Sequence, residues 1–116
     1  MNNKNIVIKH KWCLVVPLNK RGVILWNHLK ENKKYIKYFD FDDVNDEYYN
    51  LLDIGGETYK NGVFIEDYEE YAVYPKDFQF IKKAIEKLNL DKNDIPTLFE
   101  AMELAEKSNT LIEFCL

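Results

Sequence analysis

Residues 40–70 read DFDDVNDEYYNLLDIGGETYKNGVFIEDYEE. This stretch holds eleven carboxylates and a single cation, Lys60, so its formal charge is −10. Its four tyrosines are Tyr48, Tyr49, Tyr59 and Tyr68. Clustered acids speed the approach of a basic partner, and tyrosines supply rigid contact area with a hydrogen-bonding tip. The stretch is therefore a candidate binding surface.

The first half of this stretch has the apolar spacing of a helix. Its apolar residues recur at i, i+4, i+7 and i+8, which places them on one helical face. They are Val44, Tyr48, Leu51 and Leu52. Gly55 or Gly56 can supply the left-handed residue that ends such a helix. We therefore expect a helix over about residues 44–54, with Tyr48 in the core.

The second half contains the turn signal Asn61-Gly62. Asn-Gly suits both central positions of a type I′ turn, so this dipeptide predicts a β-hairpin. The implied register pairs Tyr59 with Phe64, which is a favourable aromatic contact. It also pairs Glu57 with Glu66, and two carboxylates opposite each other are unfavourable. We therefore expect either a frayed ladder or a cation between these two side chains.

Hydrophobic spacing and turn residues predict the remaining elements. Residues 5–16 are expected to form either one strand or a hairpin, ended by Pro17, and residues 35–41, 71–74 and 110–116 are expected to form further strands. The expected helices are residues 19–33, 76–89 and 95–107, with Asn19 and Asp94 as caps. These elements define an α+β fold with a single mixed, mostly antiparallel sheet of about five strands, packed with three to four helices. We expect residues 1–116 to form a single globular domain.

The charge of the chain is segregated along the sequence. The net charge is −4, but residues 1–39 carry nine lysines and arginines against one acid, Glu31. Arginine is the residue best suited to bidentate phosphate contacts, and the chain has only Arg21. We therefore expect the basic first third to offset the acidic middle or solvate the surface, and we expect no direct binding of nucleic acid.

The cysteines and the hydropathy favour a cytoplasmic protein. Cys13 and Cys115 form no CxxC pair and no disulfide framework, as is typical of a reducing compartment. Whether the two meet or form a bridge stays open. No apolar run approaches the roughly 20 residues that a membrane span requires. Heavy use of Lys, Asn, Ile and Tyr is typical of AT-rich genomes and favours a bacterial or phage origin.

Catalytic and metal motifs are missing from the sequence. Cys13 could be combined with His10 or His28, but His10 and Cys13 are three apart on an expected strand and face opposite sides. The acids from Asp40 onward fail the EF-hand pattern, because Leu51 stands where a bidentate acid is needed. No Cys/His cluster for zinc, GxSxG, HExxH or phosphate-binding glycine loop is present. We expect no enzyme, no metal and no cofactor.

The expected function is to dock on and neutralise a basic, nuclease-like bacterial toxin, and the expected partner is such a toxin or another nucleic-acid-binding protein. The expected contact residues are Asp46, Glu47, Tyr49, Asn50, Asp53, Glu57, Glu66, Asp67, Tyr68, Glu69 and Glu70. In size, charge and single-domain architecture alone, the chain resembles the immunity proteins that neutralise nuclease toxins in bacterial competition. A phage anti-defence protein that mimics nucleic acid would use the same physics. From another class, the alternative is a small enzyme or regulator with a pocket over the sheet.

Overall fold

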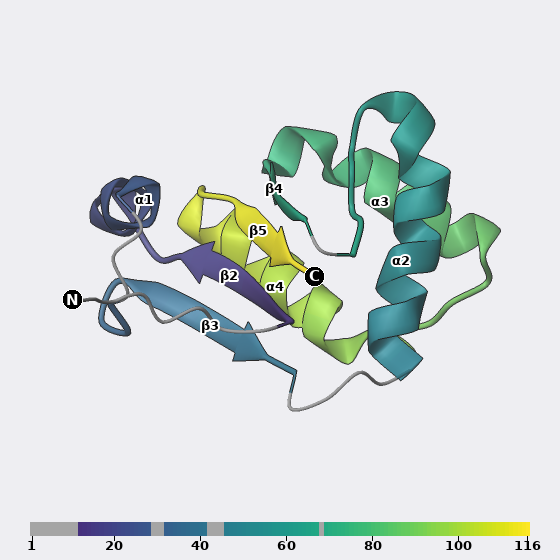
Figure 1. Ribbon diagram of the computed structural model, residues 1–116, viewed down its shortest axis with the longest axis horizontal. Coiled ribbons are helices and arrows are strands. Elements are labelled where there is room, and N and C mark those ends of the chain that lie inside the picture. Colours follow the sequence, from purple (N-terminus) through teal and green to yellow (C-terminus); the bar gives the residue numbers. More distant parts are fainter. Residues whose placement is uncertain (1–11, 29–31, 42–45, 68) are drawn as a thin grey trace.

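The computed structural model describes residues 12–28, 32–41, 46–67 and 69–116. The described strands are β2 (Cys13–Pro17), β3 (Ile36–Asp40), β4 (Glu70–Val73) and β5 (Ile112–Cys115). The α-helices are α1 (Lys20–Asn27), α2 (Asp46–Thr58), α3 (Phe78–Lys87) and α4 (Pro96–Ser108), and the 3₁₀ turns are η1 (Tyr59–Asn61) and η2 (Pro75–Asp77). Figure 1 shows α4 along one face of the sheet, with α2 and α3 beyond one side of it. No helix among the described residues is long and apolar enough to cross a membrane.

The α+β class is confirmed, with one sheet of four described strands instead of about five. Its order is β3-β2-β5-β4, and all three pairings are antiparallel. The C-terminal strand β5 lies between β2 and β4 and pairs with both. Of the predicted strand over residues 5–16, the part from Cys13 onward forms β2. Trp12 precedes it with a positive φ of 49°, and residues 5–11 lie outside the described residues.

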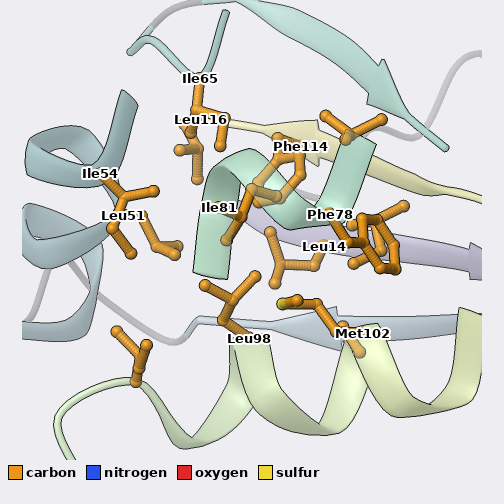
Figure 2. Close-up of a cluster of buried hydrophobic side chains, with 14 of the residues drawn as sticks. Leu14, Leu51, Ile54, Ile65, Phe78, Ile81, Leu98, Met102, Phe114 and Leu116 are labelled. Carbon is orange, nitrogen blue, oxygen red and sulfur yellow. The ribbon is translucent and has the colours of Figure 1, made fainter. Parts of the chain in front are cut away.

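Two hydrophobic clusters lie on opposite faces of the sheet. Alternate strand residues such as Leu14 and Phe114 contribute to the larger cluster, together with helix residues such as Ile81 and Leu98. Figure 2 shows these side chains between the sheet, α2, α3 and α4. The smaller cluster contains Cys13, Val15 and Ile36 with α1 residues packed against it. Helix α1 therefore packs on the face of the sheet opposite to the larger cluster, against β2 and β3.

Helix α1 is shorter than the predicted helix over residues 19–33. Asn19 caps it as expected, because its Oδ1 accepts a hydrogen bond from the Gly22 amide at 2.9 Å. The helix ends at Asn27 with His28 as its C-cap. Lys33 instead lies in the turn that leads into β3, where the Tyr35 amide donates to the Asn32 carbonyl at 3.2 Å.

The predicted hairpin at residues 60–63 is wrong. Helix α2 continues through Gly55 and Gly56 to Thr58, and η1 follows it. Gly62 then adopts a left-handed conformation with φ of 81°, so it ends the helical segment instead of closing a two-strand ladder. The helix continues because Ile54 and Thr58 extend its buried face. Burial of Gly55 and Thr58 in the further turn outweighs the local turn preference of Asn-Gly.

The register that the hairpin implied is correspondingly absent. Glu57 lies in α2, and its Oε1 lies 2.9 Å from the Lys87 Nζ, so Glu57 does not face Glu66 across a ladder. The Tyr59–Phe64 contact does form, with ring centroids 4.8 Å apart. It arises because the chain reverses direction after η1, where the Thr58 hydroxyl donates to the Val63 carbonyl at 2.8 Å.

Candidate docking surface

The outward side of α2 carries the first group of predicted contact residues. Asp46, Tyr49 and Asp53 recur at intervals of three and four, and all three are exposed. The Tyr49 side chain is 58% exposed, and its ring contacts the buried Tyr48 ring at a centroid distance of 5.7 Å. That contact fixes the orientation of an exposed tyrosine between two carboxylates. This helix side therefore presents two acids and a rigid aromatic ring to solvent.

Glu47 and Asn50 have structural roles inside the fold. Glu47 is only 8% exposed, and its Oε2 accepts a hydrogen bond from the Leu98 amide at 3.0 Å. Asn50 Nδ2 donates to the Asp94 carbonyl at 3.1 Å. Together they hold the start of α4 against α2. Asp94, the predicted N-cap of α4, does not occupy the N-cap position. Ile95 is the N-cap, and the Asp94 carboxylate accepts a hydrogen bond from the Asp91 amide.

The segment that follows η1 carries the second group of predicted contact residues. Glu66, Asp67, Glu69 and Glu70 are exposed, and Tyr68 lies outside the described residues. Val63 and Ile65 alternate with them and are buried in the core against α2. An extended backbone sends successive side chains to opposite sides, so burial of Ile65 turns Phe64 and Glu66 outward.

A hollow of about 200 Å³ lies at the end of this segment. Its lining residues are Tyr59, Phe64, Glu66, Glu69, Glu70 and Tyr71. We call it the aromatic–acidic hollow. The Phe64 ring contacts Tyr59 and Tyr71 edge-on, with centroids 4.8 and 5.5 Å away. The Tyr71 hydroxyl donates to the Gly62 carbonyl at 2.8 Å, which fixes that ring.

Sequence reasoning missed that Tyr59, Phe64 and Tyr71 gather in one place. It identified the Tyr59–Phe64 contact, but from a hairpin register that does not exist. The usable signal was the spacing of aromatics around a glycine turn, which brings residues before and after the turn together. Tyr71 joins them because β4 returns the chain beside the same turn, and its hydroxyl reaches Gly62 nine residues away.

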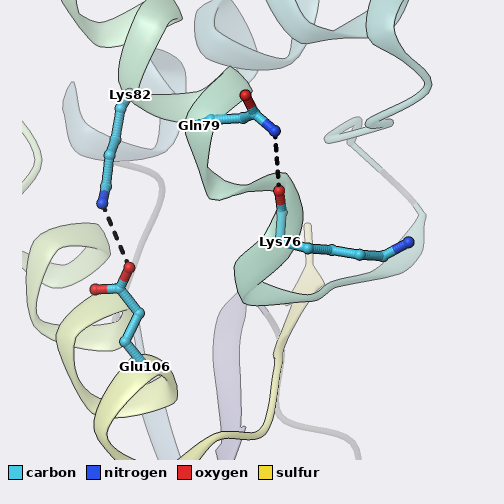
Figure 3. A network of polar contacts seen from close by, with 4 residues as sticks. All are labelled: Lys76, Gln79, Lys82 and Glu106. Carbon is cyan, nitrogen blue, oxygen red and sulfur yellow. Dashed lines mark hydrogen bonds and ion pairs between the residues drawn. The ribbon is translucent and has the colours of Figure 1, made fainter.

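Most of the exposed carboxylates in these two groups make no ion pair with another described residue. Across the described residues, Asp46, Asp53, Glu66, Asp67 and Glu69 make no ion pair. Two ion pairs between described residues use lysines of α3. Lys87 pairs with Glu57, and Lys82 pairs with Glu106 of α4 at 3.3 Å (Figure 3). The expected offset of these five acids by lysines from the first third is therefore not seen among the described residues.

The described part of the chain contains no group of three or more His, Cys, Asp or Glu side chains that could hold a metal ion. The hollow also lacks the residues of the enzyme alternative, since neither Cys13 nor His28 lines it. His28 is exposed at the end of α1, and His10 lies outside the described residues.

Cys13 and Cys115 lie directly opposite each other on β2 and β5, and both are free thiols. A hydrogen bond with Cys13 and burial raise the pKa of the Cys115 thiol, and the carboxylates of Glu113 and Glu70 raise it further. Cys13 is 1% exposed. A protonated, buried thiol is a poor nucleophile, so this pair has the character of a packing contact.

The raised pKa predicts slow alkylation of the folded protein. A free cysteine in the unfolded chain ionises near pH 8.5, whereas Cys115 in the fold remains protonated at and above that pH. Iodoacetamide should therefore label the native chain at least about tenfold more slowly than the urea-unfolded chain at pH 8.5. Mass spectrometry over time checks this. Equal rates in the two states would contradict the description of a buried, protonated pair.

No protein-family model, curated protein or solved structure matches this chain. The structure defines a small α+β protein in which residues 46–70 expose several carboxylates and two tyrosines, Tyr49 and Tyr59.

Proposed function

We propose that this chain is a small, non-catalytic binding protein that docks on a basic protein through its acidic and tyrosine-rich surface. The observation that carries the proposal is the set of five exposed carboxylates without ion pairs among the described residues, which lies in the same segment as exposed Tyr49 and Tyr59. Like charges held together without counter-ions destabilise the isolated protein, and a cationic partner relieves that repulsion.

The mode of action we propose is neutralisation of a nuclease-like toxin, as by an immunity protein acting in the cytoplasm. A protein that binds nucleic acid presents cations to phosphates, and carboxylates can occupy the same cations. Tyrosine adds affinity because it buries a large rigid ring at a low entropy cost and keeps its hydroxyl available. The proposed contact set is Asp46, Tyr49, Asp53, Tyr59, Glu66, Asp67, Glu69 and Glu70. Glu47, Asn50 and Glu57 are left out because their side chains bond to other parts of the fold, and Tyr68 is left out because it lies outside the described residues.

Two charge-reversal variants with the same net charge test the location of the surface. Asp53→Lys/Asp67→Lys changes the proposed surface, and Glu86→Lys/Glu103→Lys changes exposed acids of α3 and α4. Immobilised wild-type chain and both variants are incubated with lysate of the source cell, and each basic protein retained is then purified. Its dissociation constant is measured for all three chains at low and at high salt.

We expect the surface variant to raise the dissociation constant at least about tenfold at low salt, chiefly through a slower association rate. The control variant should change it less than about twofold, and high salt should weaken the wild-type complex. An equal increase in the dissociation constant for the two variants would show that the partner responds to net charge alone and would contradict the proposed location. A complex that is insensitive to salt would contradict the electrostatic mechanism. Neighbouring genes give an independent check, because a toxin gene beside this one would support the immunity role.

A further inference from the structure

The aromatic–acidic hollow combines two features that recognise the same kind of group. Its walls are the rings of Tyr59, Phe64 and Tyr71, and carboxylates of Glu66 and Glu69 stand beside them. The face of an aromatic ring attracts a cation through its quadrupole, and a carboxylate attracts it through full charge. Tyr59 is 57% exposed, so its ring is available to a partner.

The hollow is also held in shape by contacts inside the protein. The edge-on contacts of Phe64 with its two neighbours restrain the three rings, and the Tyr71 hydroxyl is bonded to Gly62. Burial of Val63 and Ile65 anchors the backbone between the rings and the acids. A site held in this way loses little conformational freedom on binding, so more of the contact energy appears as affinity.

The size of the hollow limits what it can accept. Pockets for drug-sized molecules and cofactors measure about 300–1,000 Å³, whereas this one measures about 200 Å³. It therefore suits one side chain of a macromolecule better than a small-molecule substrate.

We propose that the hollow binds one arginine side chain of the basic partner, an inference that rests on the proposed docking function. Arginine fits better than lysine for two reasons. Its planar guanidinium stacks on aromatic rings and is more weakly hydrated than an ammonium group, and its fork of donors can bond to a carboxylate in a bidentate way. The guanidinium stacks on the exposed face of Tyr59 and donates to Glu66 or Glu69.

The test uses isotope-labelled full-length chain and three capped amino acids, followed by NMR. N-acetyl-arginine amide is the probe, N-acetyl-lysine amide has the charge without the planar group, and N-acetyl-citrulline amide has the shape without the charge. We expect arginine to cause saturable shifts centred on Tyr59, Phe64, Glu66 and Tyr71, with weaker shifts for lysine and none for citrulline. Equal shifts for arginine and citrulline would overturn the inference, as would arginine shifts spread evenly over Asp46 and Asp53.

Tyr74 supplies a matched control, because it is 45% exposed but neither lines the hollow nor belongs to the proposed contact set. Tyr59→Ala should weaken arginine binding about fivefold, and Tyr74→Ala should leave it unchanged. If a basic protein partner loses affinity for Asp53→Lys/Asp67→Lys but binds Tyr59→Ala as tightly as wild type, the arginine inference is wrong and the docking function stands. If arginine binds the hollow selectively but no basic protein binds the surface, the docking function fails instead.

Discussion

Gly55→Ala is expected to lower the free energy of unfolding by about 3 kcal/mol or more. A Cβ at this position would lie 1.9 Å from the Ile65 carbonyl oxygen and 2.8 Å from the Ile65 carbonyl carbon. Both are backbone atoms, so no side-chain rotation can relieve the clash. The alanine variant therefore has to push the segment after η1 away from α2. Because that segment also carries Phe64 and Glu66, the hollow should lose its shape together with stability.

Gly56 is the matched control for this prediction, since it is the next residue of the same helix. A Cβ there meets nothing within 4 Å. Gly56→Ala should stabilise the protein by about 0.5–1 kcal/mol, because alanine has the higher helix propensity. Urea unfolding of both variants, followed by circular dichroism, measures the difference. If Gly55→Ala is as stable as Gly56→Ala, the segment does not pack on α2 as described.

Glu47→Ala is expected to cost about 2–3 kcal/mol of stability, the second largest effect. The change removes a charged acceptor and leaves the Leu98 amide near the start of α4 without its partner in a buried position. A buried unsatisfied donor costs more than the mean value of a hydrogen bond. The midpoint of thermal unfolding should fall by roughly 10 °C, given a few degrees per kcal/mol for a chain of this size.

Asp53→Asn is the control for Glu47→Ala, because it alters an exposed carboxylate of the same helix. Its effect on stability should stay within about 0.5 kcal/mol. The two variants also separate stability from docking. Glu47→Ala should leave partner affinity unchanged wherever the chain is folded, whereas charge changes at Asp53 act on affinity. A Glu47→Ala protein as stable as Asp53→Asn would contradict the capping role of Glu47.

The class of the fold could be predicted because hydrophobic spacing is a local property of each segment. The strand β5, the cap at Asn19 and the central helix all follow from residues within a few positions of one another. The end of α2 could not be predicted in this way. Asn-Gly supplies a left-handed residue to a hairpin or to a helix end, and only the burial of Ile54 and Thr58 decides between the two.

The candidate site was predicted in part for the same reason. Asp46, Tyr49 and Asp53 share an exposed helix side that the sequence spacing already defines. Glu47 looks equally acidic and equally available in the sequence, but its carboxylate meets an amide 51 residues away. Such a contact depends on how α4 packs on α2, and no local pattern encodes it. The hollow depends likewise on the return of β4 beside Gly62.

Hydrogen–deuterium exchange of the complex tests most directly whether a basic partner docks on the proposed surface. We predict that a bound basic protein slows amide exchange in residues 46–53 and 59–71. Exchange on the outer sides of α3 and α4, around Glu86 and Glu103, should be the same with and without the partner. Protection of α3 and α4 with unchanged exchange in residues 46–71 would contradict the proposed docking surface.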